Sequence, residues 1–346
     1  MRILITGGAG FIGSNLIHFL LKKYPGYDII NLDRLAPSGN LENLLDVARL
    51  PMYHFVQGDI CNEVEVDALM SQGVEVVIHI ATEPYPDLEE QDPARFIRTD
   101  MYGAYVLAQA AVAYKVTRFI YVSRADVYGT AATSGPTLAA VEDDVARPVQ
   151  AHVASKLGGE RLALSYFYSH ALPVIVARPS QIYGPYQYPD QFLAYCLTQA
   201  LSDEIVEIGG LGQEVADWLH VEDLCQGLDV LLHARRREVE GQVFNVATGH
   251  QRSQSEVIDL ILHFLDKPRD SVRFNDQEAS KVLPRLIDAS KLERLGWSAS
   301  INFQQGLSQT LLWYQQNMWW WEKLRQPGQT YLAPKPEDDA DLLGAI

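Results

Sequence analysis

The chain is poor in cysteine. Its 346 residues include only Cys61, Cys196 and Cys225, which lie far apart and are odd in number. A disulfide framework or a cysteine zinc site needs more thiols at close and regular spacing, and the histidines show no metal-ligand spacing either. We therefore expect no disulfide and no metal site, and a reducing compartment fits this cysteine usage.

Basic residues are also scarce. The sequence has 28 Lys and Arg against 44 Asp and Glu, which gives a net charge of -16. Nucleic acids and anionic membrane surfaces both require a basic protein surface, so we expect neither as a partner. Any recognition of phosphate must be local.

Long apolar runs are missing as well. No stretch approaches the about 18 apolar residues that a membrane span needs. The apolar run at the N-terminus is too short for a signal peptide and leads directly into a glycine turn. Hydrophobic residues make up 47% of the chain, which is ordinary for a globular protein, and we predict a cytoplasmic location.

The first thirteen residues carry the clearest pattern of the sequence. An apolar run over Ile3–Ile5 predicts a buried strand, and Gly7, Gly10 and Gly13 then mark a turn that opens a helix over Phe11–Tyr24. A side chain at Gly7 would block the tight turn, and one at Gly10 would keep a pyrophosphate away from the backbone. A side chain at Gly13 would push the helix off its strand. Free N–H groups of the helix start would face the phosphates.

A carboxylate follows at the distance that a dinucleotide site requires. Tyr27–Leu32 predicts a second strand that ends at Asp33, about 20 residues beyond the glycines. Asp33 would bind the adenosine ribose hydroxyls and repel a 2′-phosphate, so the predicted cofactor is NAD rather than NADP.

Strands and helices alternate through the first half of the chain, which predicts a doubly wound parallel α/β sheet of the Rossmann type. Further strands are predicted over Tyr53–Gln57, Val74–Ile80, Arg118–Ser123 and Pro173–Arg178, with helices over Pro93–Val116 and Gln150–His170 and a loop over Thr130–Pro148. Asp59 follows the third strand, where it could accept a hydrogen bond from adenine or cap the next helix.

The rhythm changes to shorter elements near residue 180. We expect an NAD-binding domain over residues 1–179 and a smaller mixed α/β substrate domain over 180–330, with some chain crossing back to the first domain. Helices are predicted over Asp190–Leu201, Val221–Ala234, Ser253–Leu265 and Ile301–Trp321, and residues 331–346 are predicted to be a disordered tail because they are rich in proline and acid.

Several strings resemble the extended short-chain dehydrogenase/reductases of the NAD-dependent epimerase/dehydratase type, and among them the dTDP-glucose 4,6-dehydratases. They are Leu32-Asp33-Arg34-Leu35, Gly184-Pro185-Tyr186-Gln187-Tyr188-Pro189, Asp217-Trp218-Leu219-His220-Val221-Glu222-Asp223 and Trp319-Trp320-Trp321-Glu322. The resemblance implies bound NAD, a nucleotide-sugar substrate and a homodimer formed by the helices over 93–116 and 150–170. It also implies cofactor contacts at Gly7, Gly10, Phe11, Ile12, Gly13, Asp33, Asp59, Ile60, Ala81 and Lys156.

The residues that carry the family's chemistry are altered. The family has Tyr and Lys four positions apart on one helix, whereas here the pair is His152 and Lys156. The family string Ser-Thr-Asp-Glu-Val-Tyr-Gly appears as Ser123-Arg124-Ala125-Asp126-Val127-Tyr128-Gly129, so the acid is lost and the base is shortened. General acid assistance is worth about a hundred- to ten-thousand-fold, so we predict no efficient 4,6-dehydration.

Two replacements could still support chemistry. His152 could take a hydroxyl proton, with the Lys156 ammonium disfavouring a second charge on the imidazole, or it could be structural. Arg124 could stabilise negative charge near the sugar, or form a salt bridge with Asp126. Asp100 replaces a family Asn and could pair with Lys156, and His79 is interpreted as a structural residue at a strand end.

Several residues that bind the substrate diphosphate in the family are replaced in this sequence, so we expect weaker binding of a diphosphate. Positions where the family has Arg, Asn or Lys are held here by Ala216, Gln181, Gln191, Leu283 and Pro284, with only Arg285 nearby. Three hypotheses follow: an NAD-dependent enzyme that acts at one carbon of a nucleotide-sugar or related hydroxylated substrate, a non-catalytic NAD-binding relative that acts as a sensor or partner protein, and a dTDP-glucose 4,6-dehydratase that works by an altered route.

Overall fold

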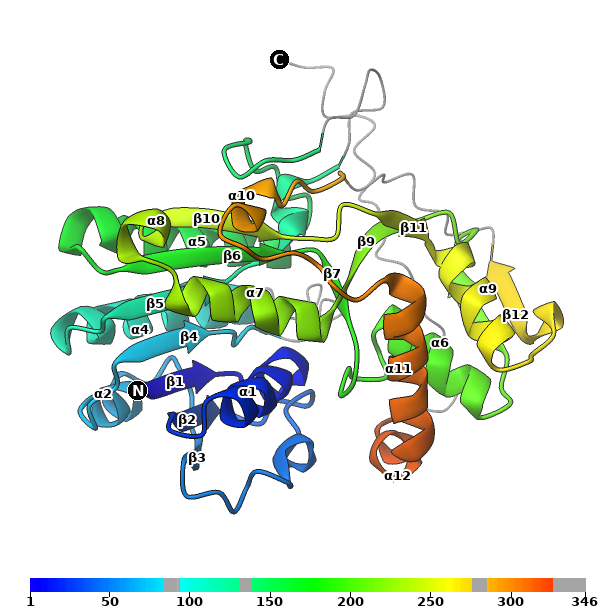
Figure 1. The fold of residues 1–346 in the computed structure, drawn as a ribbon, viewed down its shortest axis with the longest axis horizontal. Coiled ribbons are helices and arrows are strands. Elements are labelled where there is room, and N and C mark those ends of the chain that lie inside the picture. The colour runs from blue at the N-terminus through cyan, green and yellow to red at the C-terminus, as the bar shows by residue number, and fades with distance from the viewer. Residues whose placement is uncertain (84–91, 93, 131–138, 276–284, 326–346) are drawn as a thin grey trace.

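The computed structural model describes residues 1–83, 92, 94–130, 139–275 and 285–325. Its centre is a seven-stranded sheet in the order β10-β6-β5-β4-β1-β2-β3 (Figure 1). Every neighbouring pair in this sheet is parallel, which confirms the predicted doubly wound architecture. The strands are β1 (Arg2–Thr6), β2 (Asp28–Asp33), β3 (Tyr53–Gln57), β4 (Val76–His79), β5 (Arg118–Val122), β6 (Val174–Pro179) and β10 (Gln242–Val246).

Helices cover both faces of this sheet, so its central strands β4 and β5 are buried along their whole length, whereas the edge strand β3 is only partly buried. On one face, α1 (Phe11–Lys23) and α7 (Val221–His233) pack over Ile3 and Ile5. On the other face, Leu4 lies under α2 (Glu63–Met70), α4 (Gly103–Ala113) and α5 (Ala151–His170). Both α7 and β10 come from the chain after residue 180 yet belong to this layer.

The remaining elements form a smaller mixed unit at the right of Figure 1. A three-stranded sheet in the order β11-β9-β7 contains one antiparallel and one parallel pair, and β12 and β8 form a separate parallel pair. The elements are β7 (Gln181–Tyr183), β8 (Val206–Gly209), β9 (Val215–His220), β11 (Gln251–Ser253), β12 (Val272–Asn275), α6 (Phe192–Leu201), α9 (Gln254–Phe264), α11 (Phe303–Gln316) and α12 (Met318–Trp321). Short helices are α8 (Arg236–Val239) and α10 (Ser290–Glu293), and 3-10 helices lie over Leu41–Leu44, Ala125–Tyr128, Arg269–Ser271 and Glu322–Leu324.

Two predicted helices are interrupted. The helix expected over 93–116 is α3 (Ala94–Phe96), then a π-helix over Ile97–Tyr102, then α4. The helix expected over 301–321 ends at Gln316 and restarts as α12. Neither break is marked by a proline or by a change in the apolar pattern that would have predicted it.

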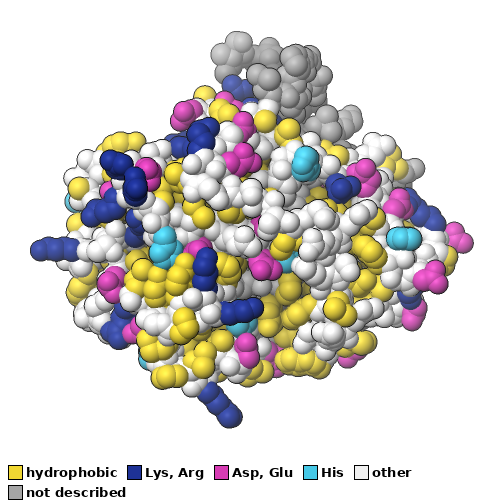
Figure 2. Space-filling view, in the orientation of Figure 1, with side chains coloured by type: hydrophobic (Ala, Val, Ile, Leu, Met, Phe, Trp, Pro, Cys, Tyr) yellow, Lys and Arg dark blue, Asp and Glu magenta, His cyan; other side chains and the backbone are white. Residues whose placement is uncertain are grey.

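Parts of two predicted segments lie outside the described residues. These are residues 131–138 of the predicted loop and the whole of the predicted tail. Among the described residues, no helix has the length and apolarity to cross a membrane. On the face shown in Figure 2, acidic and basic side chains are interspersed.

Candidate functional site

A cavity of about 350 Å³ opens at the carboxyl ends of the central strands, which is where ligands bind in open parallel sheets. Residues of the smaller unit, among them Gln181 and Gln191, form its other side. The predicted site residues that line it are Gly7, Gly10, Phe11, Ile12, Asp33, Asp59, Ile60, Ala81, Arg124, His152 and Lys156. Gly13 and Asp126 are not part of the lining.

The glycine turn is shaped by close approach of backbone to backbone. Gly7 has a φ of 72°, and a β-carbon there would lie 2.8 Å from the Cα of Ala81. At Gly13 a β-carbon would lie 2.3 Å from the carbonyl oxygen of Gly7, so this glycine fits the helix against the turn rather than against the strand. Gly10 is different, because the nearest atom to a β-carbon there is 3.4 Å away and the residue lines the cavity.

The start of α1 fits a diphosphate. Gly10 is the N-cap and supplies no side-chain hydrogen bond, while Phe11 and Ile12 of the first turn line the cavity. A helix start without a side-chain cap presents N–H groups and a partial positive charge to an anion. The cradle therefore fits the phosphates of a dinucleotide.

Asp33 is buried at the end of β2. Its two carboxylate oxygens accept hydrogen bonds from Ala9 N at 2.9 Å and Leu35 N at 2.8 Å. Burial raises the pKa of Asp33, and these backbone hydrogen bonds oppose the rise. The carboxylate is thus fixed against the glycine turn while it faces the cavity.

Asp59 does not cap the helix that follows it. It accepts a hydrogen bond from Cys61 N, whereas the N-cap of α2 is Asn62, whose side chain accepts from Val64 N and Glu65 N. The helix-capping alternative for Asp59 is therefore wrong. Its contact with adenine stays a prediction, and Asp59 lines the cavity beside Ile60.

His152 and Lys156 lie on one face of α5, and both are buried and line the cavity. Lys156 Nζ donates to Ala81 O at 3.3 Å and lies 4.9 Å from the centre of the Tyr121 ring. Burial lowers the pKa of Lys156 to about 8, against the opposing charge of Asp100.

Asp100 has other hydrogen-bond partners than the sequence suggested. Its carboxylate accepts from the Thr82 hydroxyl and the Ser155 hydroxyl, each at 2.7 Å. Within the described residues, no ion pair joins Asp100 to Lys156, so the expected direct pairing is wrong and only the charge of Asp100 acts on that lysine.

Arg124 and Asp126 form an ion pair with a nitrogen–oxygen distance of 2.5 Å, as the salt-bridge interpretation predicted. Both side chains are about two-fifths exposed, at 41% and 43%. Arg124 still lines the cavity, whereas Asp126 does not. Between them, Ala125 is buried and provides no acid.

Sequence reasoning missed a buried network behind the site. The Ser123 hydroxyl donates to Glu160 at 2.8 Å, and Arg178 Nε donates to the same carboxylate at 2.9 Å. Glu160 lies four residues after Lys156 on α5, and this helical spacing is the signal that could have found it. In a separate contact, His79 is the last residue of β4, as predicted, and its Nδ1 forms a hydrogen bond with the Thr6 hydroxyl oxygen at 2.8 Å.

The structure describes some of the positions at which the contacts with the substrate diphosphate are predicted to be weakened. Arg285 forms an ion pair with Asp144 at 2.6 Å, and Ala216 lies in β9 opposite Arg252. Leu283 and Pro284 lie outside the described residues. Over the part of the chain that is described, no group of three or more potential metal ligands occurs.

The fold and the glycine cradle define an NAD-binding protein of the Rossmann class. The sequence profile of the NAD dependent epimerase/dehydratase family matches residues 3–247, and the chain belongs to this family, whose cofactor is NAD. The predicted resemblance to the extended short-chain dehydrogenase/reductases is thereby confirmed.

Relatives cover nearly the full chain. A dTDP-glucose 4,6-dehydratase of Streptomyces niveus is 34% identical over 96% of this chain and 98% of its own length. The structure of dTDP-glucose 4,6-dehydratase from Bacillus anthracis in complex with NAD matches with a TM-score of 0.86 and 34% identity, covering 94% of this chain and 100% of that one. The structure of UDP-glucose 4-epimerase from Thermotoga maritima with UDP-glucose matches with a TM-score of 0.83 and 27% identity. The match covers 92% of this chain and 100% of that one.

Proposed function

We propose that this protein is an NAD-dependent enzyme that oxidises and reduces one carbon of a nucleotide-sugar or a related hydroxylated substrate, as in epimerisation, and that it is not an efficient 4,6-dehydratase. One observation carries the proposal. His152 and Lys156 share a buried face of α5 and both line the cavity, whereas the position of the eliminating acid is the apolar Ala125.

In this proposal His152 is the base. Bound NAD supplies the acceptor and donor of hydride. The imidazole of His152 takes the hydroxyl proton as the substrate alcohol becomes a carbonyl, and it returns that proton when the carbonyl is reduced. Lys156 disfavours a second positive charge beside it and donates to ribose hydroxyls from the cavity wall.

Arg124 would stabilise negative charge on the substrate oxygen. Arg124 lines the cavity, and its Nη2 forms the ion pair with Asp126. A guanidinium has five N–H donors, so the ion pair leaves others to face a developing alkoxide. Asp126 then acts as a positioning residue for Arg124 rather than as a base.

Two alternative functions are considered beside this proposal. A non-catalytic relative that keeps NAD and acts through a partner would also account for the Arg124–Asp126 ion pair and the altered catalytic positions. A dehydratase by an altered route would need Asp126 or a water to replace the lost acid.

The test is mass spectrometry and chromatography of purified protein incubated with dTDP-glucose, UDP-sugars and GDP-sugars in deuterated water. Bound NAD with an isomer of unchanged composition supports the proposal. Loss of one water from dTDP-glucose overturns it in favour of the altered dehydratase. Bound NAD with neither isomer nor deuterium uptake for any sugar favours the non-catalytic relative.

A reversion variant provides the control. His152→Tyr, Arg124→Thr, Ala125→Asp, Asp126→Glu and Ala216→Arg together restore the family residues, and this variant should release water from dTDP-glucose. Should it bind NAD and dTDP-glucose without dehydration, the named replacements would not account for the loss.

A homodimer and a cytoplasmic location are part of this proposal. The dimer would use the helices over 93–116 and 150–170, where Tyr105 is 36% and Tyr168 is 77% exposed. Sedimentation equilibrium of the purified chain tests the dimer, and a monomer at micromolar concentration would contradict it.

A further inference from the structure

Two neighbouring residues at the end of β2 point to different cofactors. A carboxylate at this position, here Asp33, selects NAD, whereas an arginine close by accommodates the 2′-phosphate of NADP. Arg34 is such an arginine, and it lines the same cavity as Asp33. The local sequence contains both signals, so something else must decide how Arg34 is used.

The structure places Arg34 in an ion pair across the site. Its Nη2 lies 2.6 Å from Oε2 of Glu83, whose side chain is only 1% exposed. Arg34 follows β2 and Glu83 follows β4, and these strands flank β1 on opposite sides. The pair therefore spans the end of β1, where the glycine turn begins.

Glu83 is the fixed partner of this pair. The Thr99 hydroxyl donates to the same oxygen at 3.3 Å, and Arg95 Nη2 lies 3.4 Å from the other oxygen. The Arg34 side chain is 30% exposed, and its guanidinium is held by the ion pair with the buried Glu83 carboxylate. Its position therefore depends on Glu83.

We propose that Glu83 is a cofactor-specificity residue. It holds the Arg34 guanidinium in a salt bridge and adds a second carboxylate to the cavity that contains Asp33. The salt bridge engages the guanidinium nitrogen that would otherwise be offered to a 2′-phosphate. Without the Glu83 carboxylate, Arg34 is released from this salt bridge and becomes available to bind that phosphate. The inference rests on the NAD site and not on the reaction.

The test is cofactor binding to the full chain after removal of bound nucleotide. Tryptophan fluorescence titrations with NAD and with NADP give two dissociation constants for each variant. Glu83→Gln should lower the NADP/NAD ratio of dissociation constants about tenfold, the scale of one charge-assisted hydrogen bond. An unchanged ratio overturns the proposal.

Two controls separate the release of Arg34 from a simple loss of charge. Asp190→Asn removes a carboxylate from another part of the same cavity lining and should leave the ratio within twofold. Adding Arg34→Gln to Glu83→Gln should abolish the gain in NADP binding. A gain in NADP binding in the Asp190→Asn variant overturns the proposal. So does a gain that persists when Arg34→Gln is added to Glu83→Gln.

Arg34→Gln alone tests the inference if Glu83→Gln does not fold. Because Glu83 engages the Arg34 guanidinium, its removal takes away no contact to a 2′-phosphate, and Glu83 keeps Arg95 beside it. The NADP/NAD ratio should therefore stay unchanged within twofold. A fivefold or larger loss of NADP affinity would mean that Arg34 already binds the 2′-phosphate, and it would overturn the proposal.

Discussion

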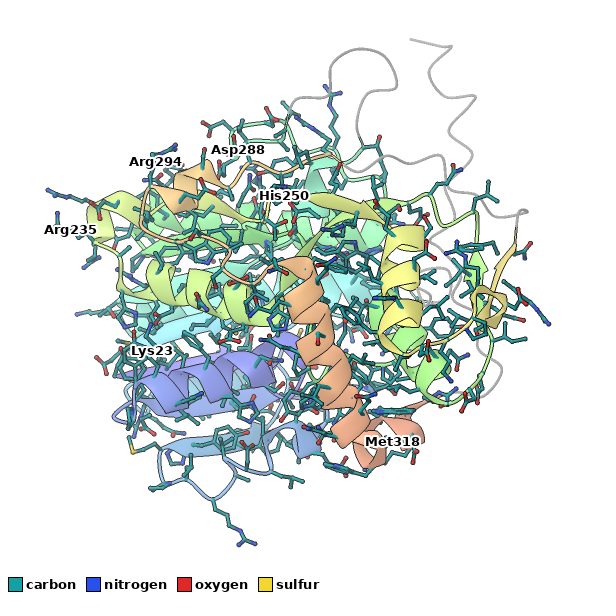
Figure 3. The ribbon with its side chains drawn as sticks, turned by 45° about the vertical axis from the view of Figure 1, so that its right-hand side comes forward. Lys23, Arg235, His250, Asp288, Arg294 and Met318 are labelled. Carbon is teal, nitrogen blue, oxygen red and sulfur yellow. The ribbon has the colours of Figure 1, made fainter. Side chains whose placement is uncertain are left out.

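At the scale of single residues, His152 is the position on which the proposed chemistry depends. It is buried and lines the cavity on the same helix face as Lys156. His152→Ala should lower the turnover number at least about a hundredfold, the usual contribution of a general base, with little change in NAD affinity. His250→Ala, in an exposed residue labelled in Figure 3, is the control. Equal turnover in the two variants would remove His152 from the mechanism.

Lys156 should make stability depend on pH in a defined direction. Burial lowers its pKa from 10.5 to about 8, so below pH 8 the ammonium is buried at a cost of about 3 kcal/mol. That cost disappears as the pH rises from 8 to 10.5, because the unfolded chain still binds the proton that the folded chain has released.

Lys156→Met removes this cost at every pH. In protein freed of cofactor, the variant should melt above the wild type at pH 7, and the difference should shrink toward pH 10. Thermal unfolding at a series of pH values measures it. A difference that stays constant with pH would show that the ammonium is not desolvated.

At the scale of elements, α5 is held against the π-helix by glycine. A β-carbon at Gly159 would lie 2.1 Å from Asp100 O and 2.5 Å from the Tyr121 hydroxyl oxygen. The sequence predicted α5 closely but not the π-helix that packs against it. This close crossing positions the helix that carries His152 and Lys156.

Gly159→Ala should therefore push α5 away from the π-helix. We expect a loss of about 1–3 kcal/mol in the free energy of unfolding, despite the higher helix propensity of alanine, and weaker binding of NAD. Urea unfolding and NAD titration measure both effects. Gly26→Ala, where no atom lies within 4 Å of a β-carbon, should change stability by no more than about 0.5 kcal/mol. Equal stability of the two variants would contradict this packing argument.

At the scale of the whole molecule, the two ends of the described chain are joined. Trp320 Nε1 in α12 donates to Asn43 Oδ1 at 2.8 Å, and Asn43 Nδ2 donates to Ala9 O in the glycine turn at 2.9 Å. Figures 1 and 3 show α11 running down to α12, where Met318 is labelled in Figure 3. A C-terminal helix thus supports the cofactor loop.

Trp320→Phe should destabilise the protein by about 2 kcal/mol, because it leaves the buried Asn43 oxygen without its donor and a void beside it. NAD affinity should fall with it. Trp319→Phe, at a 52% exposed neighbour, should have little effect on either quantity. Unfolding by denaturant measures the difference between the two variants, and equal values would exclude this link between the chain ends.

The sequence by itself determined the parallel sheet, the glycine turn and Asp33, because these follow from local patterns: apolar runs, backbone conformations that only glycine adopts easily, and a fixed spacing. The tertiary structure alone decided that Asp100 forms hydrogen bonds with Thr82 and Ser155 and that Glu83 engages Arg34. For Arg124 it selected the salt bridge with Asp126, which the sequence had offered as one of two alternatives. These partners come mostly from different strands and helices, so their meeting depends on how separate elements pack. A charged side chain takes whichever partner the packing brings within reach, and this choice leaves no periodic trace in the sequence.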